Sequence, residues 1–288
     1  MPTTIRTDLI LPSILAEDVM KGFSGRLTMA ASGAILMSAG LQAGADQVGN
    51  TVTVPYFEDG GEAQVLTESQ AGSLEKITQS SETATVVRLF KGFSVSALAR
   101  MAKASGRDIY DVAREKIQES FARAVDTLAI QRATARATSA SMVNDDSGAA
   151  ITAAGIVDTL KLFGEDLDDG DLAQWAMNPT PYWAAATLAD STGRTLFTDV
   201  QGGRLTQLGG APVKMTAKTD LVSGSVYSSL LCKKNSIVMY MNEAIRIDEE
   251  RDATADVDLI IANMYCVVHA YSIMPGTTHA GVAVLKTL

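Results

Sequence analysis

The sequence is short of the residue types that most often bind metals or transfer protons. It has only two histidines, His269 and His279, and two cysteines, Cys232 and Cys266, in 288 residues. None of these four forms a close ligand pair of the kind that zinc sites require, so no metal site is expected. His269 and both cysteines lie in apolar, strand-like runs. We therefore expect a hydrogen-bonded structural histidine and two reduced core cysteines.

Catalytic and nucleotide-binding motifs are also missing. There is no Gly-x-Ser-x-Gly sequence, and no glycine pair is followed by the Lys-Ser/Thr of a phosphate loop. The acidic segment 165–171 looks like a calcium loop, but placing Gly170 at the invariant glycine puts Leu167 and Ala176 at ligand positions. We interpret this segment as a solvated turn. The sequence predicts no enzyme, catalytic residue or cofactor, and a soluble hydrolase using these carboxylates is kept as an alternative of another class.

Basic residues are fewer than acidic residues. Lys and Arg number 24 against 33 Asp and Glu, so the formal net charge is −9. This balance disfavours direct nucleic-acid recognition, and no basic amphipathic stripe suggests a membrane surface. Trp175, Tyr182 and Trp183 are therefore expected in the core rather than on a base-stacking surface. No apolar run approaches the roughly 18 residues of a membrane span, and Leu9-Ile10-Leu11 is too short for a secretory signal.

The periodicity of the chain favours an α+β fold, because helical and strand-like segments are segregated rather than alternating. The strongest helical pattern covers 108–137, which contains no Gly or Pro and would form a rod of about 45 Å. Residues 142–148 are expected to form a turn-rich break. The other predicted helices are 12–37, 94–104, 152–163 and 178–188, and the predicted strands are 51–57, 83–90, 174–177, 204–208, 211–215, 229–232, 236–241, 244–247, 257–273 and 281–285.

The segment 49–95 carries the main functional signal from the residues themselves. Its two predicted strands, 51–57 and 83–90, are separated by about two dozen polar residues rich in Gly, Ser, Thr, Gln and Glu. A two-stranded ribbon cannot build its own core in water. We expect it to project and to contact another copy of the chain. A hairpin folded back on its own domain is the alternative.

Several segments, taken in their order, resemble tailed-bacteriophage major capsid proteins. The most specific is Val48–Asp59 (VGNTVTVPYFED), which is followed by AQVLTE at 63–68 and EKIT at 75–78. The helical entry LPSILA at 11–16, the turn KKNS at 233–236 and RDAT at 251–254 also fit. The resemblance covers nearly the whole chain and extends to the encapsulins, which share this shell-forming fold.

The resemblance implies a phage major capsid fold with five parts. These are an N-terminal arm and helix (1–48), an extended β-hairpin loop (49–95), a peripheral domain with the spine helix (96–143), an axial domain (144–234), and peripheral strands with the return of the chain (235–288). It further implies a structural protein that self-assembles into an icosahedral shell around a double-stranded DNA phage genome. An encapsulin-type compartment around a protein cargo is the alternative with the same fold.

The implied partners are other copies of the chain, in pentamers and hexamers, with a scaffolding, a portal and a decoration protein as further candidates. Packaged DNA would be enclosed rather than specifically bound, and no membrane is involved. The protein would reside in the virion after assembly in the host cytoplasm. The implied inter-subunit contacts are Glu58, Asp59, Glu62, Gln64, Glu68, Glu75, Lys76 and Arg88.

Overall fold

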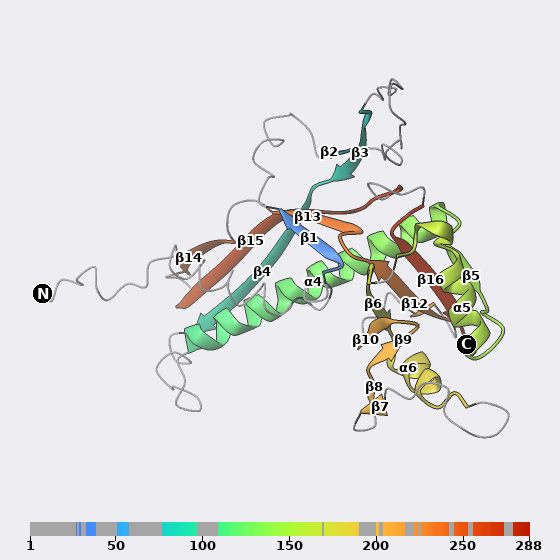
Figure 1. Cartoon of the computed structure of the whole chain (residues 1–288). Coiled ribbons are helices and arrows are strands. Elements are labelled where there is room, and N and C mark those ends of the chain that lie inside the picture. The colour runs from blue at the N-terminus through green and yellow to red at the C-terminus, as the bar shows by residue number, and fades with distance from the viewer. Residues whose placement is uncertain are drawn as a thin grey trace, which may run out of the picture.

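A computed structural model provides the structure of the chain. It describes residues 27, 29, 33–38, 51–57, 77–96, 109–168, 170–189, 200–201, 204–216, 222–223, 226–241, 245–252, 256–273 and 279–288. These residues form separate helices and several sheets, arranged around one long helix (Figure 1). The predicted α+β class is confirmed. No helix among the described residues has the length and hydropathy needed to cross a membrane.

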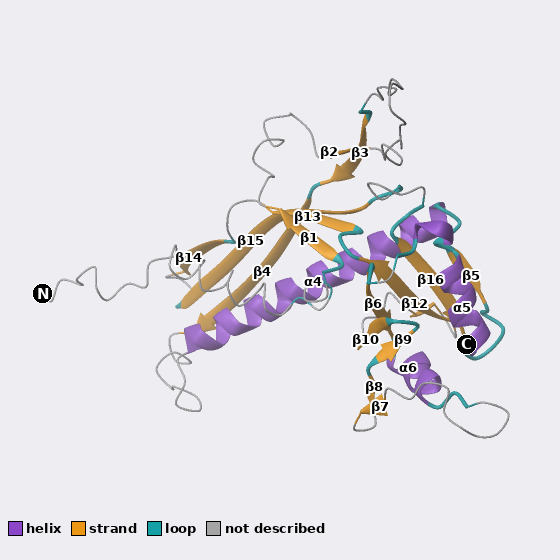
Figure 2. Ribbon diagram, viewed as in Figure 1, coloured by secondary structure: helices purple, strands orange, loops and turns teal. Residues whose placement is uncertain are grey.

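The long helix is α4 (Ile109–Ser139), which confirms the helix predicted at 108–137. Its buried side recurs at three- and four-residue spacing, with Ile117, Phe121 and Val125 almost completely shielded from solvent. Asp111 in the first turn and Arg136 in the last turn complement the helix dipole. Figure 2 shows α4 running along one sheet and ending beside the other, so a single element joins two layers of strands.

A five-stranded sheet packs along α4. Its longest strand is β15 (Val257–Ala270), which pairs antiparallel with β4 (Val87–Ser96), β13 (Ile237–Met241) and β14 (Arg246–Asp252). A short strand, β1 (Ile35–Ser38), adds to β13 in parallel. Alternation along β15 buries Ile260, Ala262 and Met264 in the same core as α4, whereas Tyr265 is exposed on the other face.

A seven-stranded sheet lies at the other end of α4. Its central strands are β12 (Val226–Lys233), β6 (Leu172–Met177) and β16 (Val282–Thr287). They carry nearly continuous buried runs, as expected of strands packed on both faces. The sheet is completed by β5 (Val143–Asp145), β9 (Gln207–Leu208), β10 (Ala211–Met215) and β11 (Val222–Ser223).

The short helices around this sheet begin at side-chain caps. The hydroxyl of Thr152 accepts a hydrogen bond from the Gly155 N–H at the start of α5 (Ala153–Lys161), and Asn178 caps α6 (Pro179–Ala186) in the same way. Gly209 and Gly210 have positive φ in the turn that joins β9 to β10. The remaining elements are η3 (Gly164–Asp166) and the strand pair β7 (Val200–Gln201) and β8 (Arg204–Leu205).

Three local predictions were wrong in part. The helix predicted at 12–37 ends in a strand, because Ile35 to Met37 pair with β13, and the part before Leu27 lies outside the described residues. Residues 94–96 of the helix predicted at 94–104 are strand, since β4 stays paired with β15 through Ser96, and residues 97–104 lie outside the described residues. The break predicted at 142–148 contains the short strand β5, which adds to β16 in parallel. In each case a partner distant in sequence decided between patterns that are ambiguous locally.

The predicted core aromatics divide in the structure. Trp175 is fully buried and its indole N–H donates to the Leu208 carbonyl at 2.9 Å, and the Tyr182 hydroxyl donates to the Leu205 carbonyl at 3.0 Å. Trp183 was predicted in the core but is 49% exposed. It lies on the exposed side of the short helix α6, whereas the neighbouring residue Tyr182 places its ring in the core.

Candidate functional site

The ribbon is formed by β2 (Thr51–Phe57) and β3 (Gln79–Thr85), which pair antiparallel from Thr51 with Thr85 to Phe57 with Gln79. This pairing confirms the predicted strand at 51–57, whereas the strand predicted at 83–90 is split at Val86. Residues before Val86 belong to the ribbon and those after it enter the five-stranded sheet as β4. Figure 1 shows the ribbon leading away from that sheet, and residues 58–76 between its strands lie outside the described residues.

The base of the ribbon has a small apolar cluster of its own, separate from the main core. One face of β2 places Val54 against Val238 of β13 and Val267 of β15, and Val54 is completely buried. The ring of Tyr56 meets that of Tyr271 edge-on, with centroids 6.0 Å apart. The other face of β2 is exposed. The ribbon is thus attached to its own body at the base, through a limited apolar contact.

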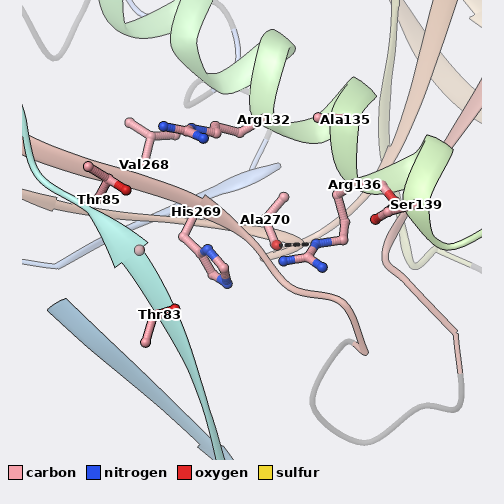
Figure 3. A pocket seen from close by; sticks show the side chains of 10 residues that line it. Thr83, Thr85, Arg132, Ala135, Arg136, Ser139, Val268, His269 and Ala270 are labelled. Atoms are coloured by element: carbon pink, nitrogen blue, oxygen red, sulfur yellow. Dashed lines mark hydrogen bonds between the residues drawn. The ribbon is translucent and has the colours of Figure 1, made fainter. Parts of the chain in front are cut away.

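A cavity of about 200 Å³ opens beside this cluster, between the ribbon and the last turns of α4 (Figure 3). Its wall combines residues of β3, α4 and the end of β15, three segments that are distant in the sequence. Basic and hydroxyl side chains contribute much of the wall, namely Thr83, Thr85, Arg132, Arg136, Ser139 and His269.

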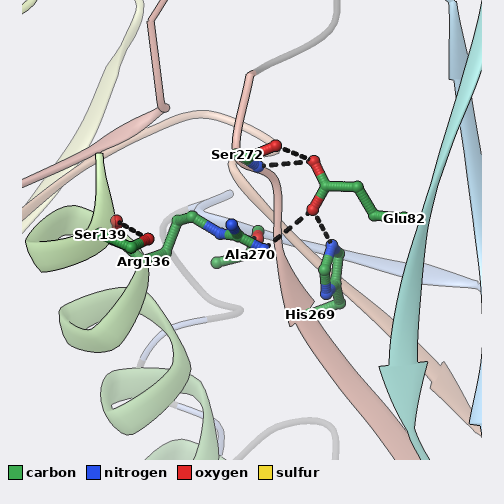
Figure 4. A network of polar contacts seen from close by, with 6 residues as sticks. All are labelled: Glu82, Arg136, Ser139, His269, Ala270 and Ser272. Atoms are coloured by element: carbon green, nitrogen blue, oxygen red, sulfur yellow. Dashed lines mark hydrogen bonds and ion pairs between the residues drawn. The ribbon is translucent and has the colours of Figure 1, made fainter.

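A polar network centred on Glu82 lies next to the cavity and ties the ribbon to the body (Figure 4). Glu82 Oε2 accepts a hydrogen bond from Arg136 Nη2 at 2.9 Å and lies 2.8 Å from His269 Nε2. Glu82 Oε1 accepts from the Ser272 backbone N–H at 3.0 Å and from the Ser272 hydroxyl. Arg136 Nε also donates to the Ala270 carbonyl at 3.0 Å. We call Glu82, Arg136, His269 and Ser272 the Glu82 network.

The Glu82 network satisfies its charges in a largely dry setting. The side chains of His269 and Glu82 are only 8% and 14% exposed, and that of Arg136 is 27% exposed. A carboxylate can only accept hydrogen bonds, so the neutral His269 ring must carry its proton on Nε2 to bond with Glu82. The predicted role of His269 as a hydrogen-bonded structural histidine is confirmed.

Two opposed effects set the protonation states in the Glu82 network. Burial raises the pKa of Glu82, but the hydrogen bonds from Ser272 and the charges of Arg136 and His269 outweigh it, so the pKa lies below its ordinary value. Burial lowers the pKa of His269, and Arg136 and Arg132 lower it further, against the raising effect of Glu82. At neutral pH the network therefore contains a carboxylate, a guanidinium and a neutral imidazole.

The predicted contact residues fall mostly on the segment between the ribbon strands. Glu58, Asp59, Glu62, Gln64, Glu68, Glu75 and Lys76 lie outside the described residues. Arg88 is described, on β4, where its side chain donates to Asn263 Oδ1 at 2.7 Å and 3.1 Å and lies over the Phe90 ring. It is exposed on the sheet face opposite α4, close to the exposed Phe90 and Tyr265. Its inter-subunit role stays a prediction.

Sequence reasoning missed Glu82, Arg136 and Ser272 as an interacting set. Glu82 and His269 are 187 residues apart, and Glu82 and Ser272 are 190 apart. Glu82 lies in the polar strand QSSETAT, where a carboxylate is unremarkable. No local pattern could have joined them, although a histidine in an apolar strand did indicate that some polar partner had to reach it.

The other sequence candidates behave as structural residues. Cys232 and Cys266 are free and buried, as predicted. In the acidic segment 165–171, Asp171 Oδ2 lies 3.3 Å from Nζ of Lys233, whose side chain is 3% exposed. Within the described part of the chain, no group of three or more His, Cys, Asp or Glu side chains is placed to hold a metal ion.

The comparisons with known proteins identify the fold. No protein-family model matches the sequence, and no curated protein does. Among solved structures, one from Microbacterium phage Oxtober96 matches with a TM-score of 0.63 and 14% identity, over 100% of this chain and 96% of that one. One from Mycobacterium phage Bobi matches with a TM-score of 0.63 and 10% identity, over 91% and 90%.

A third match is the capsid of an empty GTA particle, with a TM-score of 0.63 and 14% identity, over 100% of this chain and 94% of that one. Identities this low establish a shared fold. The chain therefore has the fold of phage major capsid proteins, as the resemblance in the sequence implied.

Proposed function

We propose that this chain is a structural shell protein, which assembles with copies of itself into a closed icosahedral particle around a double-stranded DNA phage genome. The observation that carries the proposal is the likeness to the GTA particle capsid, which extends over the whole chain. The role is structural rather than enzymatic. The protein would reside in the virion after assembly in the host cytoplasm.

The ribbon supports this proposal on independent physical grounds. Its base is held by a small apolar cluster and the Glu82 network, while Phe57 and Ile77, at the ends of the segment 58–76, are 59% and 79% exposed. Large apolar side chains at the end of a projecting ribbon favour contact with another surface. In this proposal the part of 49–95 that leaves the five-stranded sheet is the extended loop, and the contact residues predicted above, with Arg88 on β4 beside it, meet a neighbouring subunit.

The remaining parts of the chain take the roles that the resemblance implied. The segment 96–143 would form the peripheral domain around α4, 144–234 the axial domain at pentamer and hexamer centres, and 235–288 the return. The segment 1–48 would be the N-terminal arm. A scaffolding, a portal and a decoration protein are further proposed partners, and DNA would be enclosed without sequence-specific contacts.

Electron microscopy and light scattering of the purified chain test the proposal. We expect closed particles or capsomers, and their content of DNA or protein separates a phage shell from an encapsulin-type compartment. A matched variant replaces 58–78 by a short glycine-rich turn. It should give the circular dichroism of a folded subunit but assemble poorly. A wild-type chain that stays monomeric at every concentration would overturn the shell, and normal particles from the deletion would overturn the role of the ribbon.

A further inference from the structure

The cavity beside the Glu82 network has a local charge opposite to that of the whole chain. Arg132 and Arg136 bring two positive charges to its wall, and Glu82 nearby brings one negative charge. His269 adds none at neutral pH, because its pKa is lowered. The result is a net positive recess on a chain with a formal charge of −9.

The two arginines differ in how far their donors are used. Arg136 donates to Glu82 and to the Ala270 carbonyl, so two of its five N–H donors and its charge are already engaged. Arg132 lies one turn earlier on α4, is exposed, and has neither a hydrogen bond nor an ion pair with any residue in the described part of the chain. Figure 3 shows its guanidinium extending from α4 along the wall near Val268 and Thr85. Its five N–H donors are available to a ligand.

The chemistry of the wall selects an anion with oxygen acceptors. A guanidinium binds carboxylates and phosphates through paired, parallel hydrogen bonds, and hydroxyl groups can donate to the same oxygens. Thr83 and Thr85 supply such hydroxyls around the recess, whereas the Ser139 hydroxyl already donates to the Arg136 carbonyl at 2.9 Å. A volume of about 200 Å³ exceeds the roughly 30 Å³ that one water occupies in the liquid, so a group of several heavy atoms fits.

We propose that this cavity binds an anionic oxygen group, either a carboxylate or an inorganic oxyanion such as phosphate, with Arg132 as its principal contact. Two sources can supply this chemistry. One is a free anion from solution. The other is an Asp or Glu side chain of a second copy of this acidic chain, and this source rests on the proposed shell function.

Titration calorimetry with inorganic phosphate tests the cavity on unassembled wild-type subunits at constant ionic strength. Binding should weaken by about tenfold or more in Arg132→Gln, because a charge-assisted hydrogen-bonded contact is lost. Arg132→Lys keeps the charge without the paired geometry and should give an intermediate loss. Arg123→Gln removes a positive charge from an exposed position of the same helix and should leave binding unchanged. Absent wild-type binding, or equal binding by Arg132→Gln, would overturn the proposal.

Nuclear magnetic resonance gives a second readout that does not depend on heat. His269 lines the cavity, whereas His279 lies beside Gly164, away from it. Phosphate should shift the ring-proton signals of His269 and leave those of His279 in place. Shifts of equal size in both rings would indicate a general ionic effect and contradict a site.

Assembled particles distinguish the two sources of the anion. A carboxylate from a second copy predicts that particles no longer bind phosphate at the cavity, and that Arg132→Gln assembles poorly while Arg123→Gln assembles normally. A free anion predicts that particles still bind phosphate and that Arg132→Gln assembles normally. If no particles form at all, the shell proposal fails, but the titration of unassembled subunits still decides whether the cavity binds anions.

Discussion

The body of the molecule and the base of its ribbon are held in different ways. The body has one large apolar core that α4 shares with both sheets. The ribbon base relies on a small cluster around Val54, Val267 and Tyr271, and on the Glu82 network. Apolar burial scales with area and is insensitive to small shifts in geometry, whereas a polar network is favourable only when its donors and acceptors are all paired.

This difference separates the stability of the body from the orientation of the ribbon. The body can stay folded while the angle of the ribbon changes, because few apolar contacts oppose the change. We therefore expect the Glu82 network to set the orientation of the ribbon, because its hydrogen bonds require one geometry. The following measurements test that separation, beginning with the largest expected effect.

Replacing Trp175 tests the body. Its side chain is fully buried, so Trp175→Ala should lower the free energy of unfolding by about 3–5 kcal/mol through lost burial and a cavity. Trp183→Ala is the matched control and should cost about 1 kcal/mol or less, because that ring is 49% exposed. Chemical denaturation followed by circular dichroism measures both. Equal losses in the two variants would contradict the placement of the rings.

Replacing Glu82 tests the ribbon base. Glu82→Gln leaves Arg136 without its carboxylate and should cost about 1–3 kcal/mol locally. Limited proteolysis should then cut the ribbon faster, while the denaturation midpoint of the body changes little. Glu119→Gln removes a carboxylate from the exposed ion pairs with Lys116 and Arg123 and should cost about 0.5 kcal/mol or less. Identical cutting rates in the two variants would show that the network does not hold the ribbon.

Acidification should weaken the ribbon base before the body. The pKa of His269 lies below its ordinary value of 6.5, so the unfolded chain binds more protons between the two values. The contribution of His269 is therefore present above pH 6.5 and is lost as the pH falls through the lowered pKa. The lowered pKa of Glu82 maintains its contribution until the pH falls below 4.5.

A variant isolates this pH dependence. The unfolding free energy of His269→Gln should vary less than that of the wild type as the pH falls from 8 through the lowered pKa of His269. His279→Gln should retain the wild-type dependence. A His269→Gln profile parallel to that of the wild type would assign the acid sensitivity to other groups.

The smallest expected effect is on the reactivity of the two cysteine thiols, one in each of the two large sheets. Burial raises the pKa of Cys232, in the seven-stranded sheet, to about 12 and that of Cys266, in the five-stranded sheet, to about 11. Both should resist thiol reagents at pH 8 in the native chain. Glu82→Gln should leave both protected, because it frees the ribbon without opening either sheet. Selective labelling of Cys266 in that variant would show that the ribbon and the sheet open together.

Much of the fold could be predicted from local patterns. The spacing of Ile117, Phe121 and Val125 predicted α4 over nearly its full length, and alternation at Val52, Val54 and Tyr56 predicted β2 from Thr51 to Phe57. The helices predicted from Thr152 and Asn178 begin at those residues, which cap α5 and α6. The Glu82 network and the cavity could not be predicted, since their residues come from three segments that only the folded chain brings together.

The sequence by itself determined which segments are helix or strand wherever the apolar period was clear, because that period depends on neighbours only a few residues away. It also determined that 49–95 holds a ribbon too thin to support itself. The tertiary structure alone decided that Ile35 to Met37 form a strand, that the chain leaves the ribbon at Val86, and that Glu82 meets His269. Each of these depends on a partner far along the chain, and contacts across such separations are set by packing rather than by local propensity.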